Sequence, residues 1–232
     1  MPVKGTGLGS FVEIDVFDGG IGWRAHPEET MERAGHALFD GGDVWLVDPV
    51  DAEGLDDRLD ERGRLRGVVV LYNYHRRDAS AIAARHGVPV LLPAGMTALS
   101  DADVAAPVRR FEGRLGDTGY FLRPVTRNRV WQEWALFDGE TLVVAESVGT
   151  ATYFLAPGER LGVSLARRPV PPGETLADVE PTRVLCGHGE GVATDAAGEL
   201  RRALEEARRT APRMYLRHGP TFVRTLLSAT LR

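Results

Sequence analysis

The strongest constraint on the fold is the alternation of strand-length apolar runs with short helical segments between residues 43 and 92. Apolar runs at 43–47, 67–72 and 88–92 have the length and composition of strands. Between them, residues 55–62 and 77–86 carry the pattern of short helices, and Gly87 closes the second. Strands that alternate with helices in this order predict a layered α/β fold.

The chain from Gly119 onward changes to closely spaced strands with few helices. We predict strands at 120–125, 130–137, 141–145, 161–165 and 183–186, in addition to an early one at 11–17. The clearest helix spans 195–209, because its apolar residues share one face. No repeat, linker or change of composition divides the chain, so we expect a single domain over residues 1–232.

Composition narrows the classes of partner. The chain has 28 Lys and Arg against 33 Asp and Glu, which gives a net charge of −5, and its arginines form no basic stripe. We therefore expect no nucleic-acid partner. No apolar run approaches the ~18 residues that a membrane-spanning helix needs, and the start lacks a signal-peptide pattern. These observations favour a soluble, cytoplasmic protein without a membrane partner.

Chemically reactive residues follow three of the predicted strands. Asn73-Tyr74-His75-Arg76-Arg77-Asp78 follows the first, Glu146 the second and Gly187-His188-Gly189 the third. Strand ends are where layered α/β proteins gather catalytic groups from distant parts of the chain. Imidazoles and carboxylates are the ligands of zinc, iron and manganese sites. Because Cys186 is the single cysteine, any metal must be held by His, Asp and Glu.

The order of these motifs resembles the metallo-β-lactamase superfamily of metal hydrolases. The matching residues are Asp48-Pro49 after a strand, the hairpin Asp138-Gly139-Glu140-Thr141-Leu142 and the late Gly187-His188-Gly189. The similarity runs over roughly residues 11–209. It implies a four-layer αββα sandwich with its active site at the strand ends.

The departures from the family's motif predict a reduced metal site. The family's His-x-His-x-Asp-His motif is matched in register only by His75. Asp78 falls in the last histidine's place, or takes the role of the aspartate if the loop slips by one residue. Glu146 stands where the family has a bridging aspartate, and the middle histidine is missing from 129–134. We therefore expect at most one divalent ion, zinc by preference, held by His75, Asp78, Glu146 and His188.

Two functions fit these residues. In the first, the chain is a metal-dependent hydrolase of an ester, thioester or phosphoester, with Glu146 and Glu133 as catalytic candidates and Glu133 as a further ligand or base. In the second, the chain is metal-free and inactive, and it binds a small anion or a protein partner. Arg76 and Arg77 would then pair with Asp78 and fill the metal pocket, with Glu146 as the partner of Arg77.

Structural roles remain open for several of these residues. Asp78 could cap the helix at 79–86, and either histidine could be a hydrogen-bonded structural residue. The glycines at 187, 189 and 191 lack the spacing of a nucleotide-binding loop, so no nucleotide cofactor is expected. Apolar residues in 214–231 could cover a sheet edge or mediate a homodimer: Tyr215, Leu216, Phe222, Val223, Leu226 and Leu227.

Overall fold

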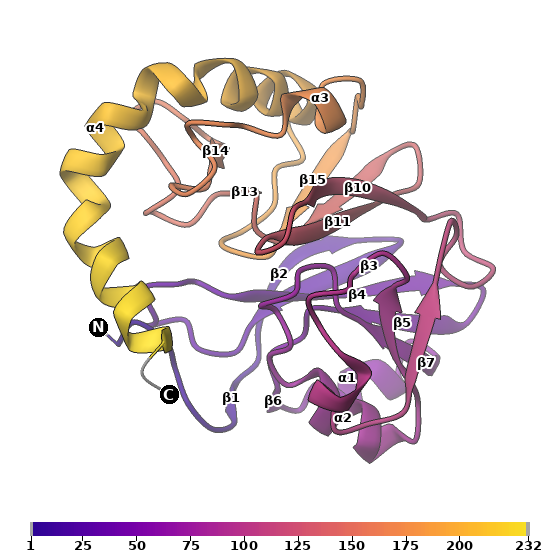
Figure 1. Ribbon diagram of the computed structural model, residues 1–232. Helices are drawn as coiled ribbons and strands as arrows, with labels where there is room; N and C mark the ends of the chain where they lie inside the picture. The colour runs from indigo at the N-terminus through magenta and orange to yellow at the C-terminus, as the bar shows by residue number, and fades with distance from the viewer. Residues whose placement is uncertain (1, 231–232) are drawn as a thin grey trace.

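Two stacked β-sheets form the centre of the molecule (Figure 1). The computed structural model describes residues 2–230, and it describes side chains as far as residue 218. The larger sheet has seven strands in the order β2-β3-β4-β5-β7-β8-β9. They are β2 (Val12–Phe17), β3 (Gly20–Arg24), β4 (Ala34–Asp40), β5 (Asp43–Val47), β7 (Arg64–Val69), β8 (Val90–Pro93) and β9 (Val108–Phe111).

The second of the two stacked sheets, called the smaller sheet below, has four strands in the order β10-β11-β12-β15. They are β10 (Phe121–Arg127), β11 (Gln132–Phe137), β12 (Thr141–Val144) and β15 (Arg183–Cys186). Two further pairs of short strands lie beside these sheets: β1 (Gly9–Ser10) with β6 (Ala52–Glu53), and β13 (Val148–Gly149) with β14 (Gly162–Val163). A short 3₁₀ helix, η1, spans Asp101–Asp103.

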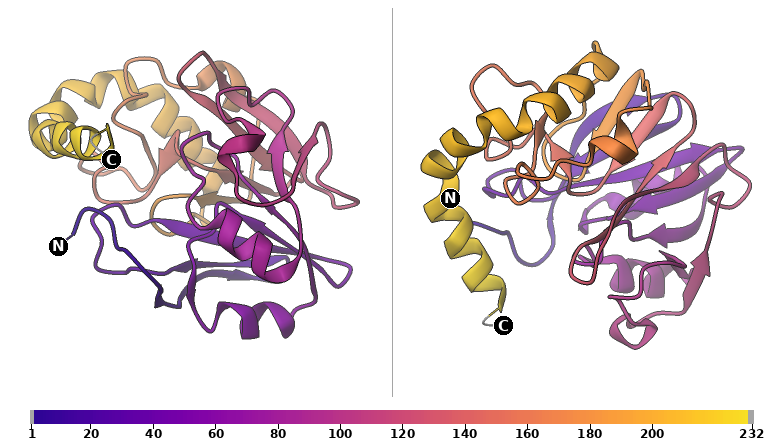
Figure 2. Two further views of the ribbon diagram at one scale, coloured as in Figure 1. Left: turned by 60° about the horizontal axis from the view of Figure 1, so that its bottom comes forward. Right: turned by 45° about the horizontal axis from the view of Figure 1, so that its top comes forward.

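Helices cover the outer faces of both sheets. On the larger sheet, α1 (Leu55–Asp60) and α2 (Ala79–His86) pack on β7. On the smaller sheet, α3 (Gly173–Leu176) packs on β10 and α4 (Ala196–Thr230) packs on β14 and β15. Figure 2 shows the same order of helix, sheet, sheet and helix from two further sides. The predicted αββα sandwich is therefore confirmed.

The alternation of side chains in β12 shows how the layers are joined. Leu142 and Val144 point into the apolar cluster that also contains Leu200 of α4. The intervening Val143 belongs instead to the core between the two sheets. Successive side chains of a strand face opposite ways. An apolar strand such as β12 therefore packs against a helix on one face and against the second sheet on the other.

Parallel pairing brings the reactive strand ends together. In the larger sheet β5, β7 and β8 run parallel, and in the smaller sheet β12 and β15 run parallel. The carboxyl ends of each group therefore lie at one edge of their sheet. The two edges also touch, because the Trp134 amide donates to Leu71 O at 2.8 Å and the Asn73 amide to Gln132 O at 3.1 Å.

The predicted elements agree with the structure where the sequence is apolar and continuous. The strands predicted at 43–47 and 183–186 have those limits in the structure. The helix predicted from 77 begins at Ala79, because Arg77 has a φ of +41°, outside the helical region. The strand predicted at 161–165 is confined to Gly162–Val163, and the helix predicted to end at 209 runs on to Thr230.

The C-terminal half of α4 is described in part. Met214 is buried beside Leu165, and the Tyr215 hydroxyl donates to Leu165 O at 2.9 Å. Leu216 is exposed. The side chains of Phe222, Val223, Leu226 and Leu227 lie outside the described residues. Among the described helices, none is both long and apolar enough to cross a membrane.

Candidate metal centre

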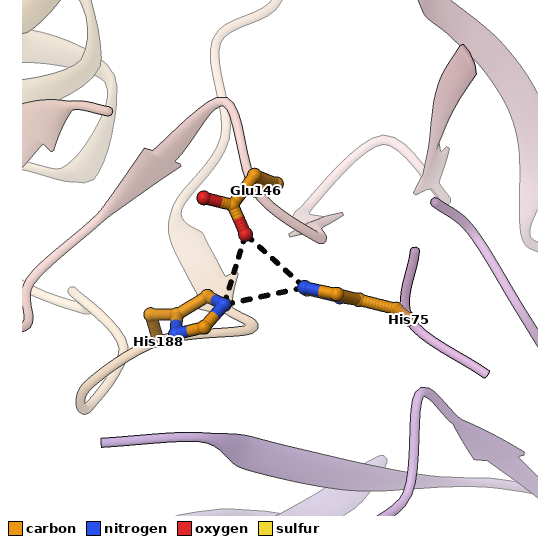
Figure 3. A group of neighbouring side chains, drawn as sticks. All are labelled: His75, Glu146 and His188. Atoms are coloured by element: carbon orange, nitrogen blue, oxygen red, sulfur yellow. Dashed lines mark hydrogen bonds and ion pairs between the residues drawn. The ribbon is translucent and has the colours of Figure 1, made fainter. Parts of the chain in front are cut away.

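His75, Glu146 and His188 point their side chains at one another (Figure 3). The Nε2 atoms of the two histidines are 3.2 Å apart. Glu146 Oε2 lies 3.1 Å from Nε2 of His75 and 3.0 Å from Nε2 of His188. Three ligand atoms from segments far apart in the sequence thus form a nearly equilateral triangle.

The fold places each of these residues just beyond the end of a strand. His75 lies in the loop after β7, Glu146 follows β12, and His188 follows β15. The pairing of Val144 with Cys186 holds Glu146 and His188 each two residues beyond adjacent strand positions. The hydrogen bonds between residues 71–73 and 132–134 bring the loop of His75 to the same edge.

Asp48 fixes the orientation of the His75 ring. Its Oδ2 lies 3.1 Å from Nδ1 of His75, and its Oδ1 accepts a hydrogen bond from the Leu71 amide at 2.9 Å. An ionised carboxylate only accepts hydrogen bonds, so Nδ1 of His75 carries the proton. The Nε2 atom of His75 therefore presents a lone pair to the cluster.

A backbone carbonyl does the same for His188. Nδ1 of His188 lies 2.7 Å from Met31 O, which can only accept, so this nitrogen carries the proton. The hydroxyl of Tyr153 lies 2.9 Å from the same nitrogen, and the Phe154 ring stacks on the imidazole at 5.7 Å. Nε2 of His188 is then a second lone pair that faces the cluster.

Burial favours the neutral form of His188, and positive charge nearby favours the ionised form of Glu146. His188 is fully buried and His75 nearly so. Burial lowers the pKa of His188, and Glu146 offsets this only in part. Burial alone would raise the pKa of Glu146, but positive charge and hydrogen bonds from His188 and His75 outweigh it and lower the pKa to about 2, so the ionised carboxylate depends on a proton or another cation shared with the two rings. With Nδ1 of each ring protonated, Nε2 of both histidines and Oε2 of Glu146 converge as three acceptors, which a proton or another cation must join.

This arrangement could hold a metal ion. Tetrahedral zinc with ligands at about 2.0 Å separates its ligand atoms by about 3.3 Å. The three distances here, 3.0 to 3.2 Å, are close to that spacing. Imidazole nitrogens whose other nitrogen donates to a carboxylate or carbonyl are typical zinc ligands. The donor set and its spacing therefore fit one zinc ion.

Asp78 is not brought into the cluster. One of its carboxylate oxygens, Oδ2, accepts from the Asp51 amide at 2.9 Å. It occupies the N-cap position of α2, as the structural alternative expected, but its side chain makes no capping hydrogen bond there. Asp78 thus ties the start of α2 to the loop after β5.

Glu133 contacts the backbone of Glu146 and Ser147. It is fully buried, and its oxygens accept from the indole of Trp131 at 2.9 Å, from the amides of Glu146 and Ser147 at 2.8 Å each, and from the Ser147 hydroxyl. Burial raises the pKa of Glu133, and these donors oppose the rise. Its contacts position the backbone of Glu146, while its role as a ligand or base stays a prediction.

Arg77 does not form the ion pairs that the metal-free hypothesis predicted. Its guanidinium donates to the carbonyls of Ala34 and Asp48 at 2.6 Å each and of Gly187 at 2.8 Å. Within residues 2–218, the ion-pair partners of Glu146 are His75 and His188. Arg76 donates to Asp103 O at 3.1 Å. Three backbone carbonyls thus accept from the Arg77 guanidinium where the hypothesis placed carboxylates.

The sequence pointed less clearly to the groups that orient the cluster. Asp48 was noted as part of the Asp-Pro pair that follows a strand at the same sheet edge, but no role in orienting a histidine was predicted for it. Tyr153 carried no such signal. A backbone acceptor such as Met31 O has no sequence signature at all, because every residue has a carbonyl.

Known structures provide an independent comparison. No family model and no curated protein matches this chain. Among solved structures it is similar to TMB-1, with 14% identity, a TM-score of 0.62, and coverage of 86% of this chain and 99% of that one. It is similar to DIM-1 metallo-β-lactamase, with 13% identity, a TM-score of 0.57, and coverage of 87% and 100%.

A third similar structure is the metallo-β-lactamase FIM-1 from Pseudomonas aeruginosa in its mono-zinc form. It shares 11% identity with this chain at a TM-score of 0.54, and the alignment covers 87% of this chain and 97% of FIM-1. Identities at this level speak for the fold alone. The arrangement of sheets, helices and strand-end loops described above is thus that of a known architecture: the chain has the metallo-β-lactamase fold.

Proposed function

We propose that this chain is a metal-dependent hydrolase in which His75, Glu146 and His188 hold a single divalent ion, zinc by preference. The observation that carries the proposal is the convergence of three proton-free ligand atoms, 3.0 to 3.2 Å apart, at one sheet edge. A bound zinc ion supplies Lewis-acid activation of water and of a carbonyl or phosphoryl oxygen. The reaction class is hydrolysis of an ester, thioester or phosphoester.

The chain's own residues prepare this centre. Asp48 and Met31 O hold the imidazoles in the tautomer that frees Nε2, and Glu133 fixes the backbone of Glu146. Glu146 is the one member of the cluster with appreciable exposure, 17% of its side chain. Substrate and water would therefore approach from the side of Glu146.

Arg77 supports the proposal of one ion rather than two. Three carbonyls from different segments hold its guanidinium beside the cluster, with a φ of +41° that L-residues rarely adopt. A fixed positive charge there repels a second cation. The mono-zinc form of FIM-1 shows that the same architecture accommodates one ion in that protein.

Metal analysis combined with activity tests the proposal. Protein purified without chelators should contain about one equivalent of zinc. Hydrolysis of p-nitrophenyl acetate, a thioester or p-nitrophenyl phosphate should disappear after chelator dialysis and return with zinc. Protein without stoichiometric metal, whose melting temperature does not respond to zinc, would reject the proposal.

The metal-free alternative is favoured by one observation, the position of Arg77. Its guanidinium raises the positive potential beside the cluster without any bound ion. A single proton shared among His75, Glu146 and His188 would then hold the triangle together, and the chain would bind an anion or a protein partner without catalysis. This alternative predicts that chelators leave the melting temperature unchanged while replacement of Arg77 by Met lowers it.

A further inference from the structure

Arg167 is a charged side chain near the cluster that the proposed function does not use. Its guanidinium carbon lies 5.8 Å from the centre of the Trp131 ring. That ring lies 4.7 Å from Tyr72, and Tyr72 lies 5.1 Å from the ring of His75. A continuous aromatic wall thus connects Arg167 with the candidate metal centre.

The guanidinium of Arg167 lacks an acceptor from the protein. Within residues 2–218 it takes part in no ion pair, and its Nε is shielded from solvent without a hydrogen-bond partner. Burial lowers the pKa of Arg167, and the nearby charge of Glu133 offsets this only in part. A guanidinium offers five donors in a fixed planar fork, so a ligand with two acceptor oxygens would satisfy what the protein leaves open.

The neighbouring Arg168 differs from Arg167 in its terminal nitrogens, which have protein acceptors although its Nε also has none, and it fixes the position of Arg167. Arg168 is fully buried and donates to both carboxylate oxygens of Glu159, at 3.0 and 2.6 Å. It also donates to Phe154 O and Thr210. These contacts fix the backbone at residues 167–168 against α4 and against the loop of Phe154 and Glu159, so the backbone of Arg167 is held in place. A preorganised donor loses less entropy when it binds a ligand.

A groove of about 530 Å³ has Arg167 in its wall. Apolar side chains of β10, of the Pro-rich loop and of α4 line much of it: Val125, Val170, Pro171, Pro172 and Leu204. Arg208 lines the groove as well and donates to Pro169 O, and Glu174 and Glu205 bring two negative charges. These four charges cancel, so the groove as a whole does not attract anions. Within the groove, an anion would therefore be attracted only close to the Arg167 guanidinium.

We propose that Arg167 binds an oxyanion group of the substrate, a phosphate or a carboxylate, with the apolar part of the molecule in the adjoining groove. Arg167 would then determine specificity by restricting the hydrolase to anionic esters. The substrate assignment rests on the proposed function, whereas binding of the oxyanion does not require the metal.

The test is an anion titration of metal-depleted protein, read by the fluorescence of Trp131. Inorganic phosphate and acetate are added separately at constant ionic strength to the wild-type, R167A, R167K and R129A proteins. Arg129 is exposed on the neighbouring loop and is the matched control. A W131F variant identifies the part of the signal that comes from Trp131.

Wild-type protein should bind at least one of the two anions saturably. R167A should weaken that binding by about tenfold or more, since a hydrogen bond to a charged group is lost. R167K should recover part of the affinity, because lysine keeps the charge but not the fork. R129A should stay within about twofold of the wild type, as exposed charges contribute little.

The outcomes separate this inference from the proposed function. Binding of phosphate alone assigns a phosphoester, and binding of acetate alone a carboxylate-bearing ester. Equal affinity of R167A and wild type, or no saturable binding by the wild type, overturns the inference. Zinc uptake by R167A should match the wild type; failure of zinc to bind either protein would reject the metal centre while leaving the anion result intact.

Discussion

Two buried charged clusters in this molecule differ in how their donors and acceptors balance. Glu29 and Arg33 are 1% and 6% exposed and form an ion pair of 2.7 Å. Glu29 also accepts from the amides of Gly5 and Arg33, while Arg33 donates to Gly5 O. In the second cluster, His75, Glu146 and His188 direct three acceptors at one another and no donor.

The difference separates a structural cluster from a candidate binding site. A buried group whose donors and acceptors match needs no further ligand, and removing one partner is costly. A buried group of converging lone pairs is unfavourable unless a cation or proton joins them. The first cluster is therefore complete as it stands, and the second is complete only with a positive ligand.

The largest effect is expected when the second cluster loses a ligand. H188A removes one of the three metal-ligand atoms, Nε2 of His188. We expect zinc affinity to fall by more than about 100-fold, which exceeds the loss expected when a residue that only contacts a ligand is replaced. Zinc should raise the melting temperature of the wild type but not of H188A. H86A is the matched control, since His86 at the end of α2 pairs with Asp56 of α1. Zinc stabilisation that survives in H188A would contradict the assignment.

Breaking the first cluster should affect stability instead. R33A leaves the Glu29 carboxylate buried with backbone donors alone, so the free energy of unfolding should fall by about 3–5 kcal/mol. R85A, which removes a half-exposed arginine from Asp51 and Asp56, should cost about 1 kcal/mol or less. Urea unfolding of metal-free protein measures both. Equal losses in the two variants would show that the burial of the pair carries no special energy.

A change of tautomer should weaken the metal site without removing a ligand. Asp48 has a φ of +44°, a conformation that asparagine tolerates, so D48N keeps the backbone. The amide can donate to Nδ1 of His75 and drive the proton to Nε2. We expect zinc affinity, measured by competitive titration, to fall by about 10- to 100-fold. Unchanged affinity would mean that Asp48 does not set the tautomer.

The smallest effect is a change in pH dependence. Burial alone would raise the pKa of Glu29, but hydrogen bonds from Arg33 and Gly5 outweigh it and lower the pKa. The unfolded chain then binds more protons in acid, so this stabilisation is present above the unfolded pKa and is lost as the pH falls through the folded pKa. E29Q should be less stable near neutrality, but its unfolding free energy should decline less between about pH 6 and pH 3. Parallel declines in both proteins would contradict this account.

Apolar pattern made much of the fold predictable. All residues of β5 and β15 after the first are buried and apolar, a pattern with few alternative interpretations. β3 and β4 were missed, because Gly20, Gly22 and Gly35 interrupt their apolar pattern and glycine disfavours strands in isolation. Trp23 of β3 packs over Gly35 of β4, and this tertiary contact supplies what local propensity lacks.

The site was predictable as a set of strand ends, but not as a geometry. His75, Glu146 and His188 were all candidates, and the parallel pairing of strands brings them together. Asp78 follows one of the same strands, yet its carboxylate binds the Asp51 amide, since the left-handed residue Arg77 sends the chain into α2. Backbone conformation at a single residue decides such outcomes, and sequence patterns do not report it.

Anomalous diffraction at the zinc edge, from crystals grown with one equivalent of zinc, tests the central claim most directly. A single anomalous peak coordinated by Nε2 of His75, a carboxylate oxygen of Glu146 and Nε2 of His188 is the result that this account predicts. An empty triangle alongside zinc at other residues, or a second ion at the position of the Arg77 guanidinium, would contradict it.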